Sequence, residues 1–312
     1  MAFDRLIEKI VEMQNPTVAG LDPKLAFIPD FIKEEAYAKY GKTLEGAAEA
    51  LLVYNKALID ALCDIVPAVK PQAAYYEMYG WQGVKALAET IAYAKSKGMF
   101  VITDGKRNDI GTTMEAYATA HLGLTDIEGD SVTAFGADAL TVNGYLGSDG
   151  INPVINVSKN MDTGMFVLVK TSNPSSGELQ NLSLESDETI YLHMGNLCEQ
   201  WGSELMGNYG YSGVGAVVGA TYPEQLTELR KALPHTFFLV PGYGAQGGTA
   251  DDIAGAFDSN GLGAIVNSSR GIMCAWQKEE NCKPEDFAQA ARREAEKMKK
   301  LLTDVTGEIK LP

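Results

Sequence analysis

The segment Met99-Phe-Val-Ile-Thr-Asp-Gly-Lys-Arg-Asn-Asp109 joins a continuous apolar run to a cluster of charged residues. The apolar part, residues 99–104, is typical of a strand that is buried on both faces, as strands of parallel sheets are. Similar β-rich runs recur along the chain. They predict eight strands, at residues 17–22, 65–70, 99–104, 138–143, 165–171, 214–220, 236–241 and 263–268.

Helical patterns separate these strands. The clearest lie at residues 44–63, 80–97, 112–122 and 223–232. Alternating strands and helices indicate an α/β protein with a parallel sheet and right-handed crossovers. Eight such units in 312 residues favour a closed (β/α)8 barrel, the TIM barrel, and we expect residues 1–312 to form a single domain.

Two connections of this barrel are longer than the others. Residues 23–43 follow the first predicted strand, and residues 172–213 follow the fifth. Long connections in compact domains are commonly lids or binding loops. In a barrel both stand on the face formed by the carboxyl ends of the strands, where we expect the active site.

The overall composition excludes several classes of protein. Hydrophobic residues make up 46% of the chain and charged residues 21%, which is typical of a globular protein with a large core. The net charge of −15 disfavours binding to nucleic acid or to an anionic membrane. We find neither a signal peptide nor an apolar run long enough to span a membrane. The four cysteines have no CxxC spacing, which favours a reduced, cytoplasmic protein.

Polar residues gather at the carboxyl ends of the predicted strands. Each residue taken alone would be an ordinary surface residue, but in a barrel all of them would face one mouth. The residues are Asp22, Lys70, Asp104, Lys106, Asn143, Lys170, Ser172 and Arg270. Their convergence predicts an enzyme active site.

Lys106 is the central residue of this group. It lies two residues after Asp104, so both side chains leave the strand on the same side, and Asp109 follows closely. Neighbouring carboxylates favour the protonated amine, which suits a general acid or a cation that stabilises a carbanion. The alternative is a solvated salt-bridge cluster in which Asp109 only caps the next helix.

The glycine-rich segment Gly242-Tyr-Gly-Ala-Gln-Gly247 follows the seventh predicted strand. It matches GxGxxG, but a dinucleotide site would need this motif after the first strand and an acidic residue after the next. In a barrel the loops after strands seven and eight bind phosphate. We therefore expect Gly244, Gln246 and Arg270 to hold a phosphate group, with a plain glycine-rich turn as the alternative.

The sequence predicts no metal site. The only histidines, His121, His193 and His235, lack the spacing of metal ligands. An aromatic cluster at residues 75–81 is expected to serve in packing or in an interface rather than in binding substrate.

The strand ends resemble those of the orotidine 5′-phosphate decarboxylases. The resemblance extends from Gly20-Leu-Asp-Pro23 to Ser269-Arg-Gly271, and Asp104-x-Lys106-x-x-Asp109-Ile110 with Thr113 is its most specific part. Further matching segments are Pro67-Ala-Val-Lys-Pro71, Lys170-Thr-Ser-Asn-Pro174 and Pro241-Gly-Tyr-Gly-Ala-Gln-Gly-Gly248. The Thr-Ser-Asn-Pro-Ser-Ser-Gly-Glu run and the long loops resemble the longer bacterial branch, type 2.

This resemblance implies decarboxylation of orotidine 5′-phosphate to UMP without a cofactor, in de novo pyrimidine synthesis. Lys106 would protonate C6 while Asp104 lies against the departing carboxylate. Binding roles would fall to several residues: Lys70 and Asp22 at the ribose, Ser172 at the pyrimidine, and Gln246 and Arg270 at the phosphate. The resemblance further implies a homodimer with shared sites, in which Asp109, Ile110 and Thr113 serve the partner's site.

Three alternatives remain open. A magnesium-dependent sugar-phosphate lyase or synthase of the same barrel superfamily shares Asp-x-Lys-x-x-Asp but places an acidic residue where this chain has Lys70. A Schiff-base aldolase could use Lys70 or Lys170. A non-catalytic phosphometabolite-binding barrel would keep Arg270 and the glycines but has no need of Lys106 between carboxylates.

Overall fold

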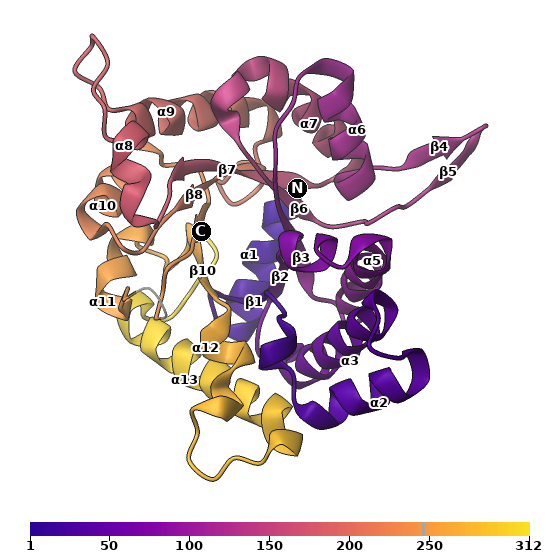
Figure 1. Cartoon of the computed structure of the whole chain (residues 1–312). Coiled ribbons are helices and arrows are strands. Elements are labelled where there is room, and N and C mark those ends of the chain that lie inside the picture. Colours follow the sequence, from indigo (N-terminus) through magenta and orange to yellow (C-terminus); the bar gives the residue numbers. More distant parts are fainter. Residues whose placement is uncertain (245–246) are drawn as a thin grey trace.

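Eight parallel strands close a barrel in the computed structural model, which describes residues 1–244 and 247–312 (Figure 1). The barrel order is β1-β10-β9-β8-β7-β6-β3-β2. The strands are β1 Thr17–Leu21, β2 Ala68–Pro71, β3 Phe100–Arg107, β6 Ala139–Val142, β7 Gly164–Lys170, β8 Val214–Val218, β9 Phe238–Val240 and β10 Ala264–Ser268. All eight predicted strands are confirmed, with ends shifted by up to three residues. The predicted (β/α)8 barrel is confirmed as well.

Helices surround the barrel on its outside and cover its amino-terminal end (Figure 1). They are α1 Ala2–Met13, α2 Asp30–Tyr40, α3 Leu44–Leu62, α4 Ala74–Glu77, α5 Gly80–Ser96, α6 Gly111–Leu122, α7 Ser148–Met161, α8 Gly177–Gln180, α9 Ile190–Gly202, α10 Pro223–Ala232, α11 Ala250–Ile253, α12 Arg270–Met273 and α13 Phe287–Thr306. Among the described residues, no helix is both long and apolar enough to cross a membrane.

The apolar core has two parts. The larger part fills the space between the strands and the surrounding helices. The smaller part fills the amino-terminal half of the barrel, where Phe3 of α1 enters from below and stacks on Phe166 of β7 with ring centres 4.8 Å apart. The barrel is therefore packed rather than hollow, and its free space lies at the opposite end.

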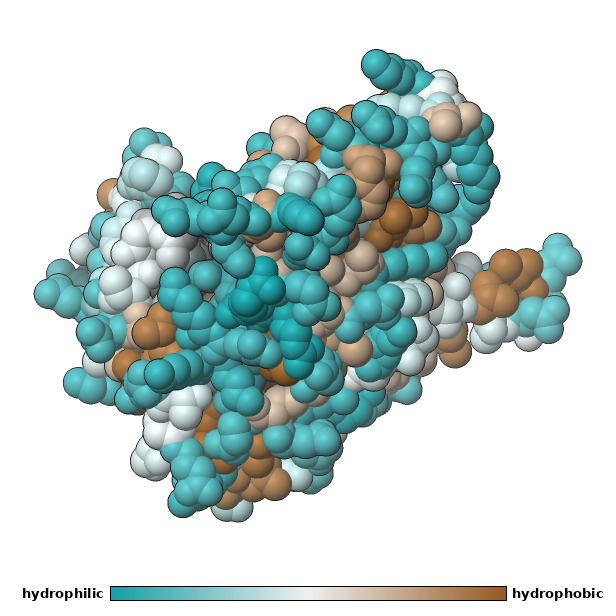
Figure 2. All heavy atoms as spheres, turned by 90° about the horizontal axis from the view of Figure 1, so that it is seen from below, coloured by the Kyte–Doolittle hydropathy of each residue, from teal (hydrophilic) through white to brown (hydrophobic). Residues whose placement is uncertain are grey.

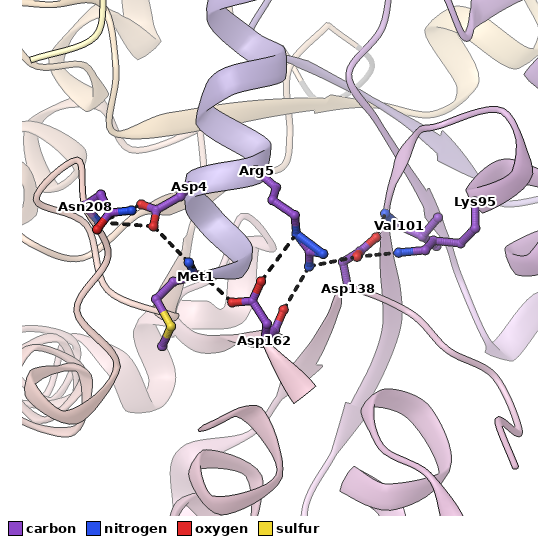
Figure 3. A network of polar contacts seen from close by, with 8 residues as sticks. All are labelled: Met1, Asp4, Arg5, Lys95, Val101, Asp138, Asp162 and Asn208. Atoms are coloured by element: carbon purple, nitrogen blue, oxygen red, sulfur yellow. Dashed lines mark hydrogen bonds and ion pairs between the residues drawn. The ribbon is translucent and has the colours of Figure 1, made fainter. Parts of the chain in front are cut away.

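A polar network fastens α1 to the amino-terminal end of the barrel (Figure 3). The buried carboxylate of Asp138, which precedes β6, accepts hydrogen bonds from Arg5 at 3.1 Å, from Lys95 at 2.5 Å and from the Val101 N–H at 2.9 Å. Arg5 also donates to the Asp162 carbonyl at 2.8 Å. Because this face of the fold carries structural rather than catalytic residues, we assign the network to stability.

The two long connections contain helices. The first carries α2, and the second carries α8 and α9. A third excursion was not predicted: β4 Thr125–Ile127 and β5 Asp130–Val132 pair as an antiparallel hairpin between α6 and β6. This hairpin projects from the body of the molecule, and Figure 2 shows apolar atoms on the projecting arm. Ile127 is 57% exposed there.

Candidate active site

A cavity of about 800 Å³ opens at the carboxyl ends of the strands. This size is ordinary for a site that binds a small molecule. Its lining comes from the strand ends and from both long connections. The lining residues include Asp22, Lys24, Phe27, Lys70, Tyr75, Asp104, Lys106, Thr141, Thr171, Ser172, Asn173, Glu178, Leu179, Gln180, Gly242, Tyr243, Asn267, Ser269 and Arg270. A cavity thus lies at the end of the barrel where the active site is expected.

Asp104 lies between two lysines at the bottom of this cavity. Its Oδ2 atom lies 2.5 Å from Nζ of Lys70, and its Oδ1 atom lies 2.6 Å from Nζ of Lys106. The side chains of Asp104 and Lys70 are buried, whereas that of Lys106 is 46% exposed. One buried carboxylate thus holds one buried ammonium and aligns a second that faces the cavity.

Two neutral side chains complete the shell around Asp104. Thr141 of β6 donates from Oγ1 to Oδ1 at 2.8 Å, and Gln72 donates from Nε2 to Oδ2 at 3.0 Å. Neither residue was expected in the site. The signal for Gln72 was its position two residues after Lys70, which places both on one side of an extended chain. Thr141 gave no such signal, because a β-branched residue inside an apolar run is typical of core.

A backbone irregularity brings Lys106 to Asp104. Lys106 has a φ of +47°, a left-handed conformation that is strained for a residue with a side chain. The register between β3 and β6 shifts here, since Thr103 pairs with Leu140 but Arg107 pairs with Val142. The Lys106 N–H is satisfied at this point by Oγ1 of Thr141, at 3.0 Å. The expectation that Asp104 and Lys106 share one side is confirmed, but a bulge rather than a regular strand achieves it.

The charges of the buried pair stabilise one another. Burial alone would raise the pKa of Asp104, but Lys70 and Lys106 lower that pKa far below its usual range. Burial alone would lower the pKa of Lys70, but the carboxylates of Asp104 and Asp22 raise it above the ordinary lysine value. Both groups are therefore ionised at neutral pH.

The cavity is cationic although the chain as a whole is acidic. The described lining contains four cationic side chains (Lys24, Lys70, Lys106, Arg270) and three carboxylates (Asp22, Asp104, Glu178). The chain carries a net charge of −15. A local excess of positive charge in a cleft attracts an anionic ligand.

Three residues are expected at the phosphate: Arg270, Gly244 and Gln246. Arg270 begins α12 and lines the cavity together with Gly242 and Tyr243. The Gly244 N–H donates to the Gly248 carbonyl at 2.8 Å, so it is not free to meet a phosphate. Gln246 lies outside the described residues.

The remaining expected residues divide into two groups. Asp22 and Ser172 line the cavity, as expected. By contrast, Asp109, Ile110 and Thr113 are absent from the cavity lining. Asp109 accepts a hydrogen bond from the Ile110 N–H at 2.8 Å, beside the start of α6.

Asn143 and Lys170 do not face the cavity, contrary to our expectation. Asn143 instead caps a short turn, where its Oδ1 atom accepts from the Tyr145 N–H at 3.0 Å. Lys170 is fully buried behind the cavity wall. Conversely, Lys24 and Tyr75 line the mouth and were not expected there; the Lys24 Nζ atom lies 5.4 Å from the Tyr75 ring centre.

The family model described as "Orotidine 5'-phosphate decarboxylase / HUMPS family" matches residues 47–283, which include β2 to β10 and the Asp104 cluster. The chain belongs to this family. A relative named orotidine 5′-phosphate decarboxylase, from Rhodopirellula baltica, is 47% identical over 271 residues, which cover 87% of each chain. The protein of the same name from Caldicellulosiruptor bescii is 43% identical and covers 88% of this chain and 90% of its own.

Solved structures agree with this family assignment. The structure of Leishmania donovani OMP decarboxylase is 30% identical, with a TM-score of 0.71 over 96% of this chain and 98% of its own. The structure of Leishmania donovani UMP synthase is 32% identical, with a TM-score of 0.72 over 95% of this chain and 56% of its own. The resemblance noted at the strand ends therefore extends to the whole fold, and the family assignment made from the sequence is confirmed.

Proposed function

We propose that this chain decarboxylates orotidine 5′-phosphate to UMP and CO2, as a carboxy-lyase of de novo pyrimidine synthesis in the cytoplasm. The observation that supports this most directly is the Lys70–Asp104–Lys106 cluster at the bottom of a cationic cavity. The substrate carries a phosphate and a carboxylate, which matches the positive charge of the cavity. The names of the relatives point to the same reaction.

Lys106 is the proposed proton donor. As the C6–carboxylate bond breaks, its electron pair stays on C6, and CO2 leaves without a proton. The Lys106 ammonium then transfers one proton to C6 and recovers it from water. A fixed ammonium next to a developing carbanion lowers the barrier, because the charge is in place before the reaction begins. The 2.6 Å contact with Asp104 fixes its direction.

Asp104 and Lys70 prepare this proton transfer. We propose that Asp104 lies against the departing carboxylate and orients Lys106, while Lys70 contacts the ribose and balances the charge of Asp104. The buried contact of 2.5 Å between them keeps Asp104 ionised. The mechanism uses side chains of the protein alone and requires no cofactor.

Residues farther along the cavity would bind the rest of the substrate. We assign Asp22 to a ribose hydroxyl, Ser172 to the edge of the pyrimidine, and Arg270 with Gln246 to the phosphate. Arg270 supports this assignment because it lines the cavity at the start of α12. Gly244 would act through the shape of its turn, since its N–H is engaged within the loop.

We further propose that the protein acts as a homodimer with shared sites. Asp109, Ile110 and Thr113 would reach the site of the partner rather than their own. The surface around α6 supports this, because Ile110, which directly precedes the helix, is 52% exposed and Tyr117 within the helix is 37% exposed. Exposed apolar side chains grouped on one helix are typical of an interface. Each subunit would contribute one single-domain barrel, residues 1–312.

The test is the reaction itself. Wild-type protein treated with EDTA is incubated with orotidine 5′-phosphate, the absorbance of the substrate is followed, and the product is identified by NMR. We expect complete conversion to UMP at a rate that added Mg²⁺ does not change. A strict requirement for Mg²⁺ would favour the sugar-phosphate lyase or synthase. Trapping of a covalent adduct by borohydride would favour the Schiff-base aldolase.

A further inference from the structure

Lys170, the last residue of β7, is a fully buried lysine that the proposed reaction does not use. Its Nζ atom donates to Ser176 Oγ at 2.9 Å and to Asn181 Oδ1 at 2.9 Å. The same atom lies 4.3 Å from the ring centre of Tyr222. All of these partners are neutral, and no carboxylate in residues 1–244 or 247–312 forms an ion pair with Lys170.

Such an environment is costly for a charged group. A buried ammonium without a counter-ion loses its hydration, and burial accordingly lowers the pKa of Lys170. An unbranched apolar side chain such as methionine would fill the same space without this cost. What methionine could not supply is a pair of hydrogen bonds to two separate points of the following loop.

Those two points lie at either end of α8. Ser176 directly precedes the helix, and Asn181 directly follows it. Within α8, Glu178, Leu179 and Gln180 line the active-site cavity. Figure 1 shows α8 at the rim of the barrel, beside α9. The buried Lys170 ammonium therefore forms hydrogen bonds at both ends of α8, a one-turn helix that forms one wall of the cavity.

The near end of the same loop is fastened by other contacts. The Ser172 carbonyl accepts from Thr221 Oγ1 at 3.2 Å. A Cβ atom on Gly219, the residue that follows β8, would lie 2.8 Å from Ser172, so the chain after β8 approaches Ser172 closely. Ser172 thus has contacts that do not involve Lys170. The α8 wall has such a contact as well, because Gln180 and Thr171 exchange hydrogen bonds of 2.8 and 2.9 Å, whereas Lys170 bonds the residues at both of its ends.

We propose that Lys170 is a positioning residue that holds α8 as a preformed wall of the nucleotide-binding cavity. This inference rests on the proposed function, because it assigns to that wall a role in binding orotidine 5′-phosphate. Lys170 touches neither Asp104 nor Lys106, and β6 separates its strand from β3. Loss of Lys170 therefore weakens substrate binding while the proton-transfer step stays intact.

The test compares kcat and KM for orotidine 5′-phosphate in the wild type and in Lys170→Met. Lys159→Met is the control, because Lys159 is a surface lysine of α7 that pairs with Glu204. We expect Lys170→Met to raise KM about tenfold or more and to change kcat less than about threefold. For Lys159→Met we expect both kcat and KM to equal the wild-type values. A merely structural role would lower the amount of active enzyme, and therefore kcat, at constant KM.

Two further variants act on the partners of Lys170. Ser176→Ala and Asn181→Ala each remove one hydrogen-bond acceptor of Lys170 from the loop and leave the barrel core intact. They therefore test the positioning role even if Lys170→Met does not fold. We expect each to raise KM. Added to Lys170→Met, we expect neither to have a further effect, because residues that act through one contact are not additive. Unchanged KM in both alanine variants would overturn the proposal, as would full additivity.

A second measurement separates this proposal from the proposed function. If the wild type does not decarboxylate orotidine 5′-phosphate, the proposed function is wrong. The positioning role is then tested by limited proteolysis. We expect cleavage within residues 172–181 to be faster in Lys170→Met than in the wild type or in Lys159→Met. Equal cleavage rates in the three proteins would contradict the positioning role.

Discussion

The Nζ atom of Lys70 lies 2.5 Å from Oδ2 of Asp104, and both side chains are more than nine-tenths buried. Pairs of this kind add little to stability as a whole, because desolvation offsets their attraction. They do fix the positions of both side chains, because moving either one away would leave the other as a buried charge without a counter-ion. In this barrel the pair fixes the position of the Asp104 carboxylate. The other oxygen of that carboxylate, Oδ1, contacts Nζ of Lys106 and orients it.

Asp104→Asn is expected to destabilise the protein, because it leaves the Lys70 ammonium buried without a counter-ion. The expected loss in the free energy of unfolding is about 3–5 kcal/mol, measured with urea at pH 7. In the double variant Lys70→Met/Asp104→Leu most of this stability returns, while decarboxylation stays absent. If Asp104→Asn were as stable as the wild type, the pair would not be buried as described.

The pair also predicts a dependence on pH. The pKa of Asp104 is lowered on folding, so its contribution is present above about pH 4 and is lost as the pH falls below that value. The pKa of Lys70 is raised, so its contribution is present below about pH 10 and is lost at higher pH. The stability difference between wild type and Asp104→Asn should therefore shrink in acid.

His121 predicts a second, separate effect of acid. Burial, with a smaller contribution from Arg107, lowers its pKa to about 4. The unfolded chain binds a proton at this residue below about pH 6.5, whereas the folded chain does not, so stability falls between those values. The expected loss is about 3 kcal/mol between pH 7 and pH 4.

The matched variant for this effect is His121→Phe. The His121 ring stacks on Phe135 with centres 4.7 Å apart, and a phenyl ring preserves that stacking. Urea unfolding of the variant is expected to lose the pH dependence between about 6.5 and 4. The same dependence in both proteins would show that another group is responsible.

Arg270→Ala tests the phosphate site. Loss of a charge-assisted contact of about 1.5–3 kcal/mol corresponds to a rise in KM of roughly 10- to 100-fold for orotidine 5′-phosphate. The control is orotidine, which lacks the phosphate and should react equally slowly with wild type and variant. An equal loss with both substrates would place Arg270 elsewhere in the mechanism.

Mixing two inactive variants tests the shared sites. In a heterodimer of Lys106→Ala and Asp109→Ala, one site carries both substitutions and the other carries neither. Equal mixing with free exchange makes half of the dimers mixed, so about a quarter of the wild-type activity should return. Steady-state rates before and after mixing measure this recovery. If the mixture stays inactive although light scattering shows exchanged dimers, Asp109 serves its own subunit's site.

The eight strands could be predicted from the sequence because parallel strands buried on both faces are continuous apolar runs. The β4–β5 hairpin escaped prediction for the opposite reason. Its strands have three residues each, and the exposed face they carry mixes Ile127 with charges. Short alternating segments of this kind resemble loops.

The site could be predicted where polar residues end apolar runs, as at Asp104 and Lys70. Contacts that depend on the register between neighbouring strands could not be predicted. The approach of Thr141 to Asp104 requires the bulge at Lys106, and nothing in the residue types reveals that shift. The burial of Lys170 was also missed, since a lysine at a strand end faces either the mouth or the surrounding helices, and only packing decides between them.

The most direct test of the account is the rate of decarboxylation by Lys106→Ala in the presence of EDTA. Orotidine 5′-phosphate consumption by the wild type and by the variant is measured under identical conditions, and UMP binding shows that the variant's site is intact. We predict that the variant binds UMP but decarboxylates orotidine 5′-phosphate about 10²- to 10⁴-fold more slowly than the wild type, as expected when a proton donor is removed. A variant that decarboxylates at the wild-type rate would contradict the proposed mechanism.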